Sequence, residues 1–314
     1  MRYSLSFGKK SSKILLGTAY FGDTISKEDS FRIMDKYIEL GGNHIDTARL
    51  YADGRAEEVI GEWLKDRKPN ELFLSTKGAF PNVNTPDVSR LSDAEIRYDL
   101  EKSLKALGLE CIEFYWLHRD DESIPVSQMI DTLNALVKEG KIKKFGASNW
   151  RAYRIKEANQ YAESNGLMGF SASQVRFSPA MIAPQGTADR TLVDMDGESM
   201  KYYAENNFPV AAYASQAKGF FSKMASIGES GLSVKSKERY LCAENLKKLE
   251  MIKELSKKYD CSIAAIVCGA LCSLQSPDVF PIIGGSRIEQ IEDSMKGSDI
   301  VLSPEELTAL IQFE

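Results

Sequence analysis

The sequence predicts a single-domain α/β protein: a (β/α)8 TIM barrel over residues 1–314, with a short N-terminal hairpin and an extra C-terminal helix. Short β-rich runs alternate with longer helical patterns along the whole chain, which is typical of parallel strands joined by crossover helices. Eight such runs fit within 314 residues, a size that suits one closed barrel. An open doubly wound sheet is the alternative, but no G-x-G-x-x-G follows the first core strand.

The first half of the chain supplies five of the predicted core strands. Helices are placed where apolar residues recur every three or four positions, for example after Ser26, a good N-cap, and before the helix stop at Gly108. In order, the elements are a hairpin strand at Arg2–Phe7, a strand at Lys13–Leu16, a helix at Ser26–Leu40, a strand at His44–Asp46, a helix at Ala56–Lys65, a strand at Leu72–Thr76, a helix at Asp93–Leu107, a strand at Cys111–Leu117, a helix at Val126–Glu139 and a strand at Lys144–Gly146.

The second half supplies three more strands and most of the remaining helices. The stretch Ala214–Ser236, rich in Gly, Ser and Lys, is too long for a simple connector, and we expect a functional loop there. The other elements are a helix at Trp150–Ser164, a strand at Ser171–Val175, a helix at Glu198–Asn206, a strand at Pro209–Tyr213, helices at Arg239–Lys258 and Ser262–Leu274, a strand at Phe280–Ile283, a helix at Arg287–Met295 and a last helix that begins near Ser303.

Composition excludes several classes of protein. With 43% hydrophobic and 27% charged residues, the chain can bury a large core. The net charge of -5, with no offsetting Lys/Arg cluster, argues against a nucleic-acid partner. No apolar run is long enough to span a membrane, and the start MRYSLSFGKK has no signal-peptide core, so we expect a cytoplasmic protein.

Metal binding is not expected. The five cysteines are odd in number and lack paired C-x-x-C spacing, and Cys268 and Cys272 fit small buried helix residues better than ligands. Only two histidines are present, which disfavours a barrel enzyme that hydrolyses its substrate with a metal ion.

Polar residues at the ends of successive strands indicate a site. Asp46 closes the second core strand, Lys77 follows the third and His118 the fourth, while Tyr51 lies in the loop after Asp46. In a (β/α)8 barrel the carboxyl ends of the strands meet on one rim, so we expect these four side chains to converge. A carboxylate, an ammonium group, a phenol and an imidazole in contact can tune one another's pKa, which indicates proton chemistry. We expect the other histidine, His44, to have a core or supporting role.

Eight motifs then carry a resemblance to a known family. They are GTAYFG from Gly17, NHIDTARLY from Asn43, STKG from Ser75, YWLHRDD from Tyr115, GASNW from Gly146, SQV from Ser173, YASQAKG from Tyr213 and PIIGGSRIEQIEDS from Pro281. In order and spacing, over nearly the whole chain, the sequence resembles the aldo-keto reductases, NAD(P)H-dependent carbonyl reductases built on the (β/α)8 barrel.

The resemblance implies a role for each of the four converging residues. Tyr51 matches the family's proton donor, and Lys77, ion-paired with Asp46, is expected to lower the phenol pKa from about 10 toward the working pH. His118 is expected to orient the substrate carbonyl. The implied reaction is hydride transfer between NADPH and a carbonyl compound, aldehyde or ketone to alcohol, or the reverse oxidation of a polyol.

The resemblance also implies a cofactor site. Ser148, Asn149 and Gln174 match residues that bind the nicotinamide carboxamide, and Tyr213 matches the aromatic ring that stacks on the nicotinamide. The further cofactor residues implied are Gly17, Thr18, Ser215, Gln216 and Gly219, with the last three at the pyrophosphate.

Residues near the C-terminus match the family's adenosine-phosphate site. They are Gly284, Ser286, Arg287 and Gln290. A guanidinium group at Arg287 suits a 2′-phosphate, so NADP(H) is favoured over NAD(H). The sequence departs from the common pattern at Asp293 and Ser294, where many members have Glu and Asn.

The substrate end is less informative. Tyr20, Phe21, Phe80, Arg119 and Trp150 are candidates for the walls of a substrate pocket. Three consecutive charged residues begin at Arg119, which favours a sugar, polyol or related carbonyl compound.

A second class of function stays open. It is a cofactor-binding regulatory or redox-sensing protein on the same fold with little turnover, like the potassium-channel β subunits that resemble this family. The expected partners are a small carbonyl or polyol substrate and no nucleic acid or membrane, with the chain a monomer or weak homo-oligomer.

Overall fold

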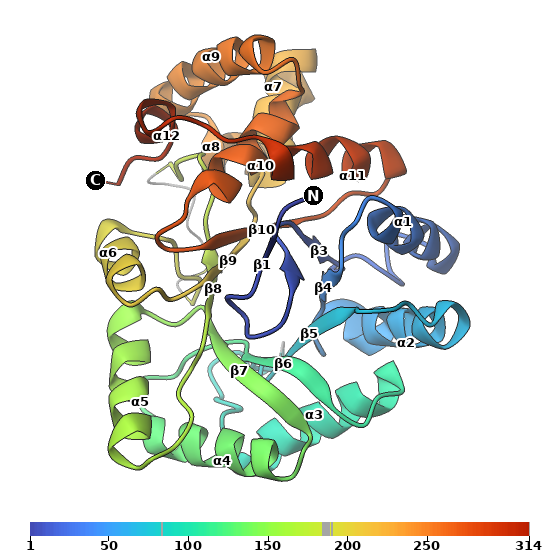
Figure 1. The fold of residues 1–314 in the computed structure, drawn as a ribbon, viewed down its shortest axis with the longest axis vertical. Helices are drawn as coiled ribbons and strands as arrows, with labels where there is room; N and C mark the ends of the chain where they lie inside the picture. The colour runs from blue at the N-terminus through green and yellow to red at the C-terminus, as the bar shows by residue number, and fades with distance from the viewer. Residues whose placement is uncertain (83, 184–188, 190, 314) are drawn as a thin grey trace.

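Eight parallel strands close into a barrel, which confirms the predicted fold class (Figure 1). The computed structural model describes residues 1–82, 84–183, 189 and 191–313. The strand order around the barrel is β10-β3-β4-β5-β6-β7-β8-β9, so the last strand pairs with the first and the sheet has no free edge. The strands are β3 (Leu15–Gly17), β4 (His44–Asp46), β5 (Phe73–Gly78), β6 (Ile112–Leu117), β7 (Ile142–Ser148), β8 (Ser173–Arg176), β9 (Val210–Tyr213) and β10 (Val279–Ile283).

Helices surround the barrel. Figure 1 shows α1 and α2 on one side, α5 and α6 on the opposite side, and the helices from α7 onward gathered together at the top of the view. The helices are α1 (Lys27–Glu39), α2 (Arg55–Arg67), α3 (Asp93–Leu107), α4 (Val126–Lys138), α5 (Ala152–Ser164), α6 (Gly197–Glu205), α7 (Phe220–Ile227), α8 (Val234–Tyr240), α9 (Ala243–Lys258), α10 (Ile263–Ser273), α11 (Ile288–Met295) and α12 (Pro304–Leu310).

The predicted hairpin and the extra C-terminal helix are both present. Strand β1 (Tyr3–Ser4) pairs antiparallel with β2 (Ser11–Ser12). Helix α12 begins with Ser303 as N-cap, whose side chain accepts from Glu306 N in a capping box.

The hairpin closes the amino end of the barrel. The turn between β1 and β2 carries Phe7, which is 1% exposed. Its ring lies 5.9 Å from Phe73, the first residue of β5, 5.4 Å from Phe114 in β6, and 4.7 Å from Phe280 in β10. These aromatic rings fill the barrel interior opposite the carboxyl ends of the strands, so the candidate site has a solid floor.

The prediction of a long loop at Ala214–Ser236 is wrong in part, because much of this stretch is helical. It contains the helix α7 and the first residues of α8. Phe220 and Phe221 anchor α7 in a buried cluster beneath it, and the abundant Gly and Ser around them hid this apolar face. The predicted helix Arg239–Lys258 is also interrupted, because α8 ends at Tyr240 and α9 begins at Ala243.

Among the predicted core strands, only His44–Asp46 has the bounds that the structure shows, and the others differ at one or both ends. The first core strand runs over Leu15–Gly17 instead of Lys13–Leu16, and the short strand predicted at Lys144–Gly146 is β7, which extends over Ile142–Ser148. The longer β7 makes an extensive parallel register with β6. Pairing on the neighbouring strand, which a single sequence does not display, therefore sets the length.

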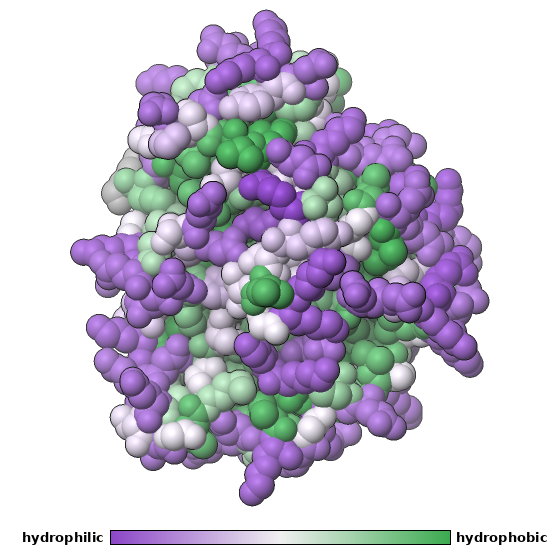
Figure 2. All heavy atoms as spheres, in the orientation of Figure 1, coloured by the Kyte–Doolittle hydropathy of each residue, from purple (hydrophilic) through white to green (hydrophobic). Residues whose placement is uncertain are grey.

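Polar and charged side chains cover most of the face on which the hairpin lies, as Figure 2 shows. In the part of the chain that the structure describes, no helix is both long and apolar enough to cross a membrane.

Candidate active site

Four polar side chains meet at the carboxyl ends of β4, β5 and β6. Lys77 in β5 donates from Nζ to Asp46 Oδ2 in β4 at 2.5 Å and to Tyr51 Oη at 3.3 Å. The Lys77 and Asp46 side chains are 1% and 2% exposed. His118, the residue after β6, has its ring centroid 6.1 Å from that of Tyr51. An ammonium group therefore lies between a carboxylate and a phenol, with an imidazole beside them.

A rigid loop places Tyr51 over Lys77. Tyr51 begins a short turn, η1 (Tyr51–Gly54), which ends in the left-handed region with φ of 94° at Gly54. A side chain there would collide with Arg49, since an added Cβ would lie 1.3 Å from the guanidinium Nη2. Arg49 Nη1 in turn donates to the fully buried Glu57 at 2.7 Å. This ion pair fixes the loop against α2.

The pKa of Tyr51 contradicts the expectation drawn from its partners. Burial raises the pKa of Tyr51 above its usual value, and the opposing effect of Lys77 does not cancel that rise. The pKa of Lys77 is also raised: burial alone would lower it, but Asp46 and Tyr51 more than offset the loss of solvent. Lys77 is therefore a firmly charged group next to a protonated phenol at neutral pH.

His118 is held as a neutral imidazole. Burial, with Lys77 and Arg119 nearby, lowers the pKa of His118 well below its usual value. His118 is only 7% exposed, yet its Nδ1 has no hydrogen-bond partner among the described residues. Phe80 packs edge-on against its ring at 5.0 Å. A buried polar atom without a partner is costly, so this nitrogen is available to a molecule bound at the site.

The residues predicted to bind the nicotinamide lie next to this group. Gln174 in β8 donates from Nε2 to Asp46 Oδ1 at 3.1 Å. Asn149, with φ of 58°, follows β7, and its Oδ1 accepts from Tyr213 Oη at 2.6 Å. Asn149 Nδ2 reaches Ser148 Oγ at 3.2 Å. The backbone N–H of Asn149 also donates to Gln174 O at 2.9 Å, so the four predicted amide- and ring-binding residues form one connected set.

The next predicted cofactor residues, including those expected at the pyrophosphate, lie around the ends of β3, β9 and β10. Ser215 Oγ donates to Ile282 O at 2.7 Å, which ties the loop after β9 to β10. Gln216 Nε2 donates to Ser294 Oγ at 2.9 Å, so one residue that departs from the family pattern still contacts the predicted site. Thr18, just after β3, donates from Oγ1 to Asp46 O at 3.1 Å, and Gly17 is the last residue of β3.

The start of α11 presents the last predicted cofactor residues. Gln290 Oε1 accepts from the backbone N–H groups of Ser286 at 2.9 Å and of Arg287 at 3.3 Å. The Arg287 side chain is exposed. At Gly284 an added Cβ would have only Gly17 O within 4 Å, at 3.8 Å. The surface between β3 and β10 is therefore open where the adenosine phosphate is predicted.

Lys218 is a feature that the sequence did not single out. It lies directly before Gly219, and partial loss of solvent, together with the nearby cations Arg239 and Lys235, lowers the pKa of Lys218. Three positive charges therefore lie beside the loop after β9, which suits a polyanionic ligand. The sequence shows Lys218 in YASQAKG, but Lys235 and Arg239 meet it only through the fold of α8.

The predicted substrate residues differ in position. Phe80 lies under the Arg119 guanidinium, 4.6 Å from ring centroid to Cζ, and beside His118. Tyr20 is 54% exposed, whereas Phe21 is 1% exposed and packs in the core. Trp150 is fully buried, and its Nε1 donates to Arg119 O at 3.0 Å. Phe80 and Arg119 thus border the four-residue group directly, while Trp150 supports the backbone of Arg119.

Only the first of the three consecutive charges faces the candidate site. Arg119 Nη1 donates to His118 O at 2.9 Å, and its Nε donates to Thr191 Oγ1 at 3.0 Å. Asp120 is paired with Arg154, and Asp121 accepts from Ser123. The carboxylates of Asp120 and Asp121 are therefore already engaged by Arg154 and Ser123, and the preference for a sugar or polyol, which was drawn from all three charges, stays a prediction.

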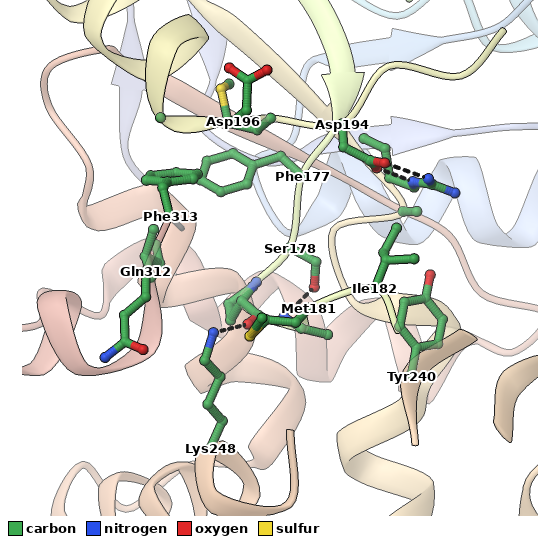
Figure 3. A pocket seen from close by; sticks show the side chains of 17 residues that line it. Phe177, Ser178, Met181, Ile182, Asp194, Asp196, Tyr240, Lys248, Gln312 and Phe313 are labelled. Atoms are coloured by element: carbon green, nitrogen blue, oxygen red, sulfur yellow. Dashed lines mark hydrogen bonds and ion pairs between the residues drawn. The ribbon is translucent and has the colours of Figure 1, made fainter. Parts of the chain in front are cut away.

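A cavity of about 300 Å³ lies between the segments that follow β8 and the C-terminal residues Ile311–Phe313 (Figure 3). Its lining includes Arg176, the last residue of β8, and Ala214, the residue after Tyr213. Lys248 enters it from α9 and donates to Pro179 O at 2.9 Å. None of the four converging residues lines this cavity.

Comparison with known proteins identifies relatives over nearly the whole chain. A model of the aldo/keto reductase family matches residues 13–314. Norsolorinic acid reductase B of Dothistroma septosporum is 29% identical, with 96% of this chain and 79% of that protein covered. The uncharacterized oxidoreductase YrpG of Bacillus subtilis is 28% identical, with 96% and 92% covered. An aryl-alcohol dehydrogenase [NADP(+)] of Phanerodontia chrysosporium is 26% identical, with 96% and 82% covered.

A solved structure has the same fold. It is the thermostable aldo-keto reductase Tm1743 in complex with the inhibitor epalrestat, with a TM-score of 0.75 and 23% identity. The match covers 99% of this chain and 98% of that chain.

Proposed function

The chain belongs to the aldo/keto reductase family and is an NAD(P)H-dependent carbonyl reductase, and we propose that Tyr51 is its proton donor and NADPH its preferred cofactor. One observation carries the assignment of Tyr51. The buried ammonium of Lys77 contacts both Asp46 Oδ2 and Tyr51 Oη, at 2.5 and 3.3 Å. This arrangement supplies a proton from the phenol and stabilises the negative charge that remains on its oxygen.

The reaction needs a hydride, which the reduced nicotinamide supplies when it is bound. The neutral imidazole of His118 can donate a hydrogen bond to the substrate carbonyl oxygen, and it orients that oxygen toward Tyr51. Tyr51 then transfers its proton to this oxygen, while Lys77 remains charged throughout. In the oxidation of an alcohol the same groups act in reverse.

The described residues fit a dinucleotide phosphate. Asn149 and Gln174 present side-chain amides beside the four-residue group. The open surface at Gly284 and the cations around Lys218 suit phosphates along one edge of the barrel. The exposed guanidinium of Arg287 is the residue best placed for a 2′-phosphate.

Arg287→Met should separate the two cofactors. A charge-assisted hydrogen bond is worth about 1.5–3 kcal/mol, so the Kd for NADPH should rise about 10- to 100-fold, while the Kd for NADH should stay within about twofold. Tryptophan fluorescence titration measures both constants. The matched control is Arg32→Met, which removes a 68%-exposed guanidinium from α1. Equal losses for NADPH and NADH would remove Arg287 from the phosphate site.

We further propose an aryl or sugar-like aldehyde that carries a carboxylate or hydroxyl group, recognised by Arg119. The guanidinium donates to two neutral acceptors, Thr191 Oγ1 and His118 O, and the nearest carboxylate among the described residues, that of Asp189, lies 3.8 Å away. Burial lowers the pKa of Arg119, so a bound anion would compensate a poorly solvated cation. The aryl-alcohol dehydrogenase among the relatives supports the choice of aryl aldehydes.

Turnover with a matched substrate panel tests the proposed function. Benzaldehyde and 4-carboxybenzaldehyde, glyceraldehyde and butanal should all consume NADPH, with KM lower for the polar member of each pair. Arg119→Met should raise KM for 4-carboxybenzaldehyde about tenfold or more and change KM for benzaldehyde by no more than about threefold. Equal effects on the pair would exclude recognition by Arg119. Tight NADPH binding without turnover on any compound would contradict the catalytic roles and favour a regulatory protein.

A further inference from the structure

A chain of buried hydrogen bonds runs through the barrel from the N-terminal hairpin to Asp46. Ser11 Oγ in β2 lies 2.8 Å from His44 Nδ1, and His44 Nε2 lies 3.2 Å from Ser75 Oγ. Ser75 Oγ then donates to Asp46 Oδ1 at 2.8 Å. Ser11, His44 and Ser75 are all 0% exposed. The chain ends on the carboxylate oxygen that Lys77 does not contact.

The direction of each proton in this chain follows from its last member. A carboxylate only accepts, so the hydroxyl proton of Ser75 points toward Asp46. The Ser75 oxygen can then accept from His44 Nε2–H, which leaves Nδ1 to accept from the hydroxyl of Ser11. That hydroxyl also has Ser12 O within reach at 3.1 Å, but His44 Nδ1 is closer, at 2.8 Å. Burial and the charge of Lys77 lower the pKa of His44 well below its usual value, in agreement with a neutral ring that has one proton. Every donor is therefore directed toward the carboxylate.

We propose that His44 is a positioning residue that acts through Ser75 to hold Asp46, and that the hairpin contributes Ser11 to hold His44. The inference rests on the proposed function, because it assigns these residues to the support of Tyr51. Asp46 is 2% exposed, so protein donors must replace water around both of its oxygens. The Ser75 and Gln174 side chains hold Oδ1, and Lys77 holds Oδ2.

A change in the hydrogen bonds of Asp46 affects Tyr51, the proposed proton donor, because Lys77 contacts both residues. Lys77 has three acceptors, and its contact with Tyr51 Oη at 3.3 Å is the longest, compared with 2.5 Å to Asp46 and 2.7 Å to Thr47 O. A carboxylate that lacks the Ser75 donor is less well stabilised and draws Lys77 toward itself. Tyr51 then becomes a weaker acid. No substrate- or cofactor-binding residue proposed above belongs to the Ser11–His44–Ser75 chain.

The structural alternative is that His44 only fills space. Its ring lies 4.2 Å from that of Phe73 and 5.3 Å from that of Phe7, so it also packs against the aromatic floor. A packing role predicts that substitutions lower the free energy of unfolding and leave the chemistry of the folded enzyme unchanged. The two roles therefore differ in kcat and in the pKa of Tyr51.

Four variants distinguish the two roles. His44→Phe keeps a ring but removes both nitrogens, whereas His44→Gln keeps an amide N–H that can reach Ser75. Ser75→Ala removes the link to Asp46. The matched control is Ser12→Ala: Ser12 is the neighbour of Ser11 in β2 and is 0% exposed, but its hydroxyl contacts Tyr37 Oη, Ile14 O and Asn43 N and not the His44 ring.

Steady-state kinetics with NADPH and the best aldehyde provide the first measurement. His44→Phe and Ser75→Ala should lower kcat about 10- to 100-fold, with KM and the Kd for NADPH within about twofold of the parent values. His44→Gln should recover most of kcat, and Ser12→Ala should keep it. An unchanged kcat in His44→Phe, or a Gln variant no better than the Phe variant, would overturn the proposal.

A second measurement needs no turnover. The resonance of Tyr51 in protein labelled with ¹³Cζ-tyrosine, assigned by its loss in Tyr51→Phe, follows ionisation of the phenol directly. The charged and titratable groups that act on Asp46 and Tyr51 include Lys77, His44, His118, Arg119 and Tyr213. The pKa of Tyr51 should rise further in His44→Phe and Ser75→Ala but not in Ser12→Ala. An unchanged pKa in both would refute the positioning role, whereas the expected rise in a protein without turnover would refute only the proposed function.

Discussion

Tyr51→Phe is expected to lower kcat for carbonyl reduction by about 10²- to 10⁴-fold, the range contributed by a positioned general acid. The ring keeps its place near His118, but the hydroxyl that Lys77 contacts is lost. Binding of NADPH should change by no more than about twofold, because the phenol holds no predicted cofactor group. Single-turnover absorbance at the nicotinamide band and fluorescence titration separate these effects.

The matched control for Tyr51→Phe is Tyr203→Phe. Tyr203 is equally an aromatic hydroxyl in a hydrogen bond, at 3.0 Å from Ser173 Oγ, but it is fully buried on α6 outside the barrel. Its loss should leave kcat unchanged. Since burial raises the pKa of Tyr51, the phenol stays protonated at neutral pH, and reduction should decline only as the pH rises through that raised pKa. A Tyr51→Phe variant with parental kcat would exclude Tyr51 as the proton donor.

Lys77→Met is expected to lower the free energy of unfolding by about 3–5 kcal/mol, in addition to abolishing turnover. The substitution leaves the 2%-exposed carboxylate of Asp46 without its charge partner. Urea unfolding followed by tryptophan fluorescence at pH 7 measures the loss. Because the folded pKa of Lys77 is raised, the stabilisation is fully present below the unfolded pKa and is lost only as the pH rises through the folded value.

The double variant Asp46→Asn, Lys77→Met makes this prediction specific. It removes both charges, so it should recover part of the stability while turnover stays absent, since Tyr51 still lacks its cation. Lys253→Met removes an exposed partner of Glu250 and should cost no more than about 0.5 kcal/mol. A Lys77→Met variant as stable as the parent protein would mean that Asp46 becomes protonated or hydrated at little cost.

The fold was accessible from the sequence because its signals are local. Runs such as Cys111–Leu117 and stops such as Gly108 show strand and helix boundaries directly, and the structure has β6 and the end of α3 at those places. Helix α7 was not accessible, because its two anchors, Phe220 and Phe221, lie among small and polar residues. Their apolar partners are supplied by α10, which lies more than forty positions further along the chain.

The placement of the four converging residues followed from one rule, that polar residues at strand ends meet on one rim. The pKa shifts of these residues did not follow from that rule. The direction of the Tyr51 pKa depends on burial, which is a property of the assembled barrel and outweighs the visible partner Lys77. For the same reason, the sequence could not show that Asp120 is paired with Arg154 on α5.

The pairing of β3 with β10 joins the first and last strands of the barrel. The N-terminal hairpin is also held by residues near the C-terminus, between positions 278 and 300. Arg2 donates to Ser298 and Ile300, and Lys13 is paired with Asp278. During synthesis Arg2 and Lys13 therefore leave the ribosome long before their partners exist. These contacts join residues more than 260 positions apart, so they can form only after nearly all the strands and helices between them have been made.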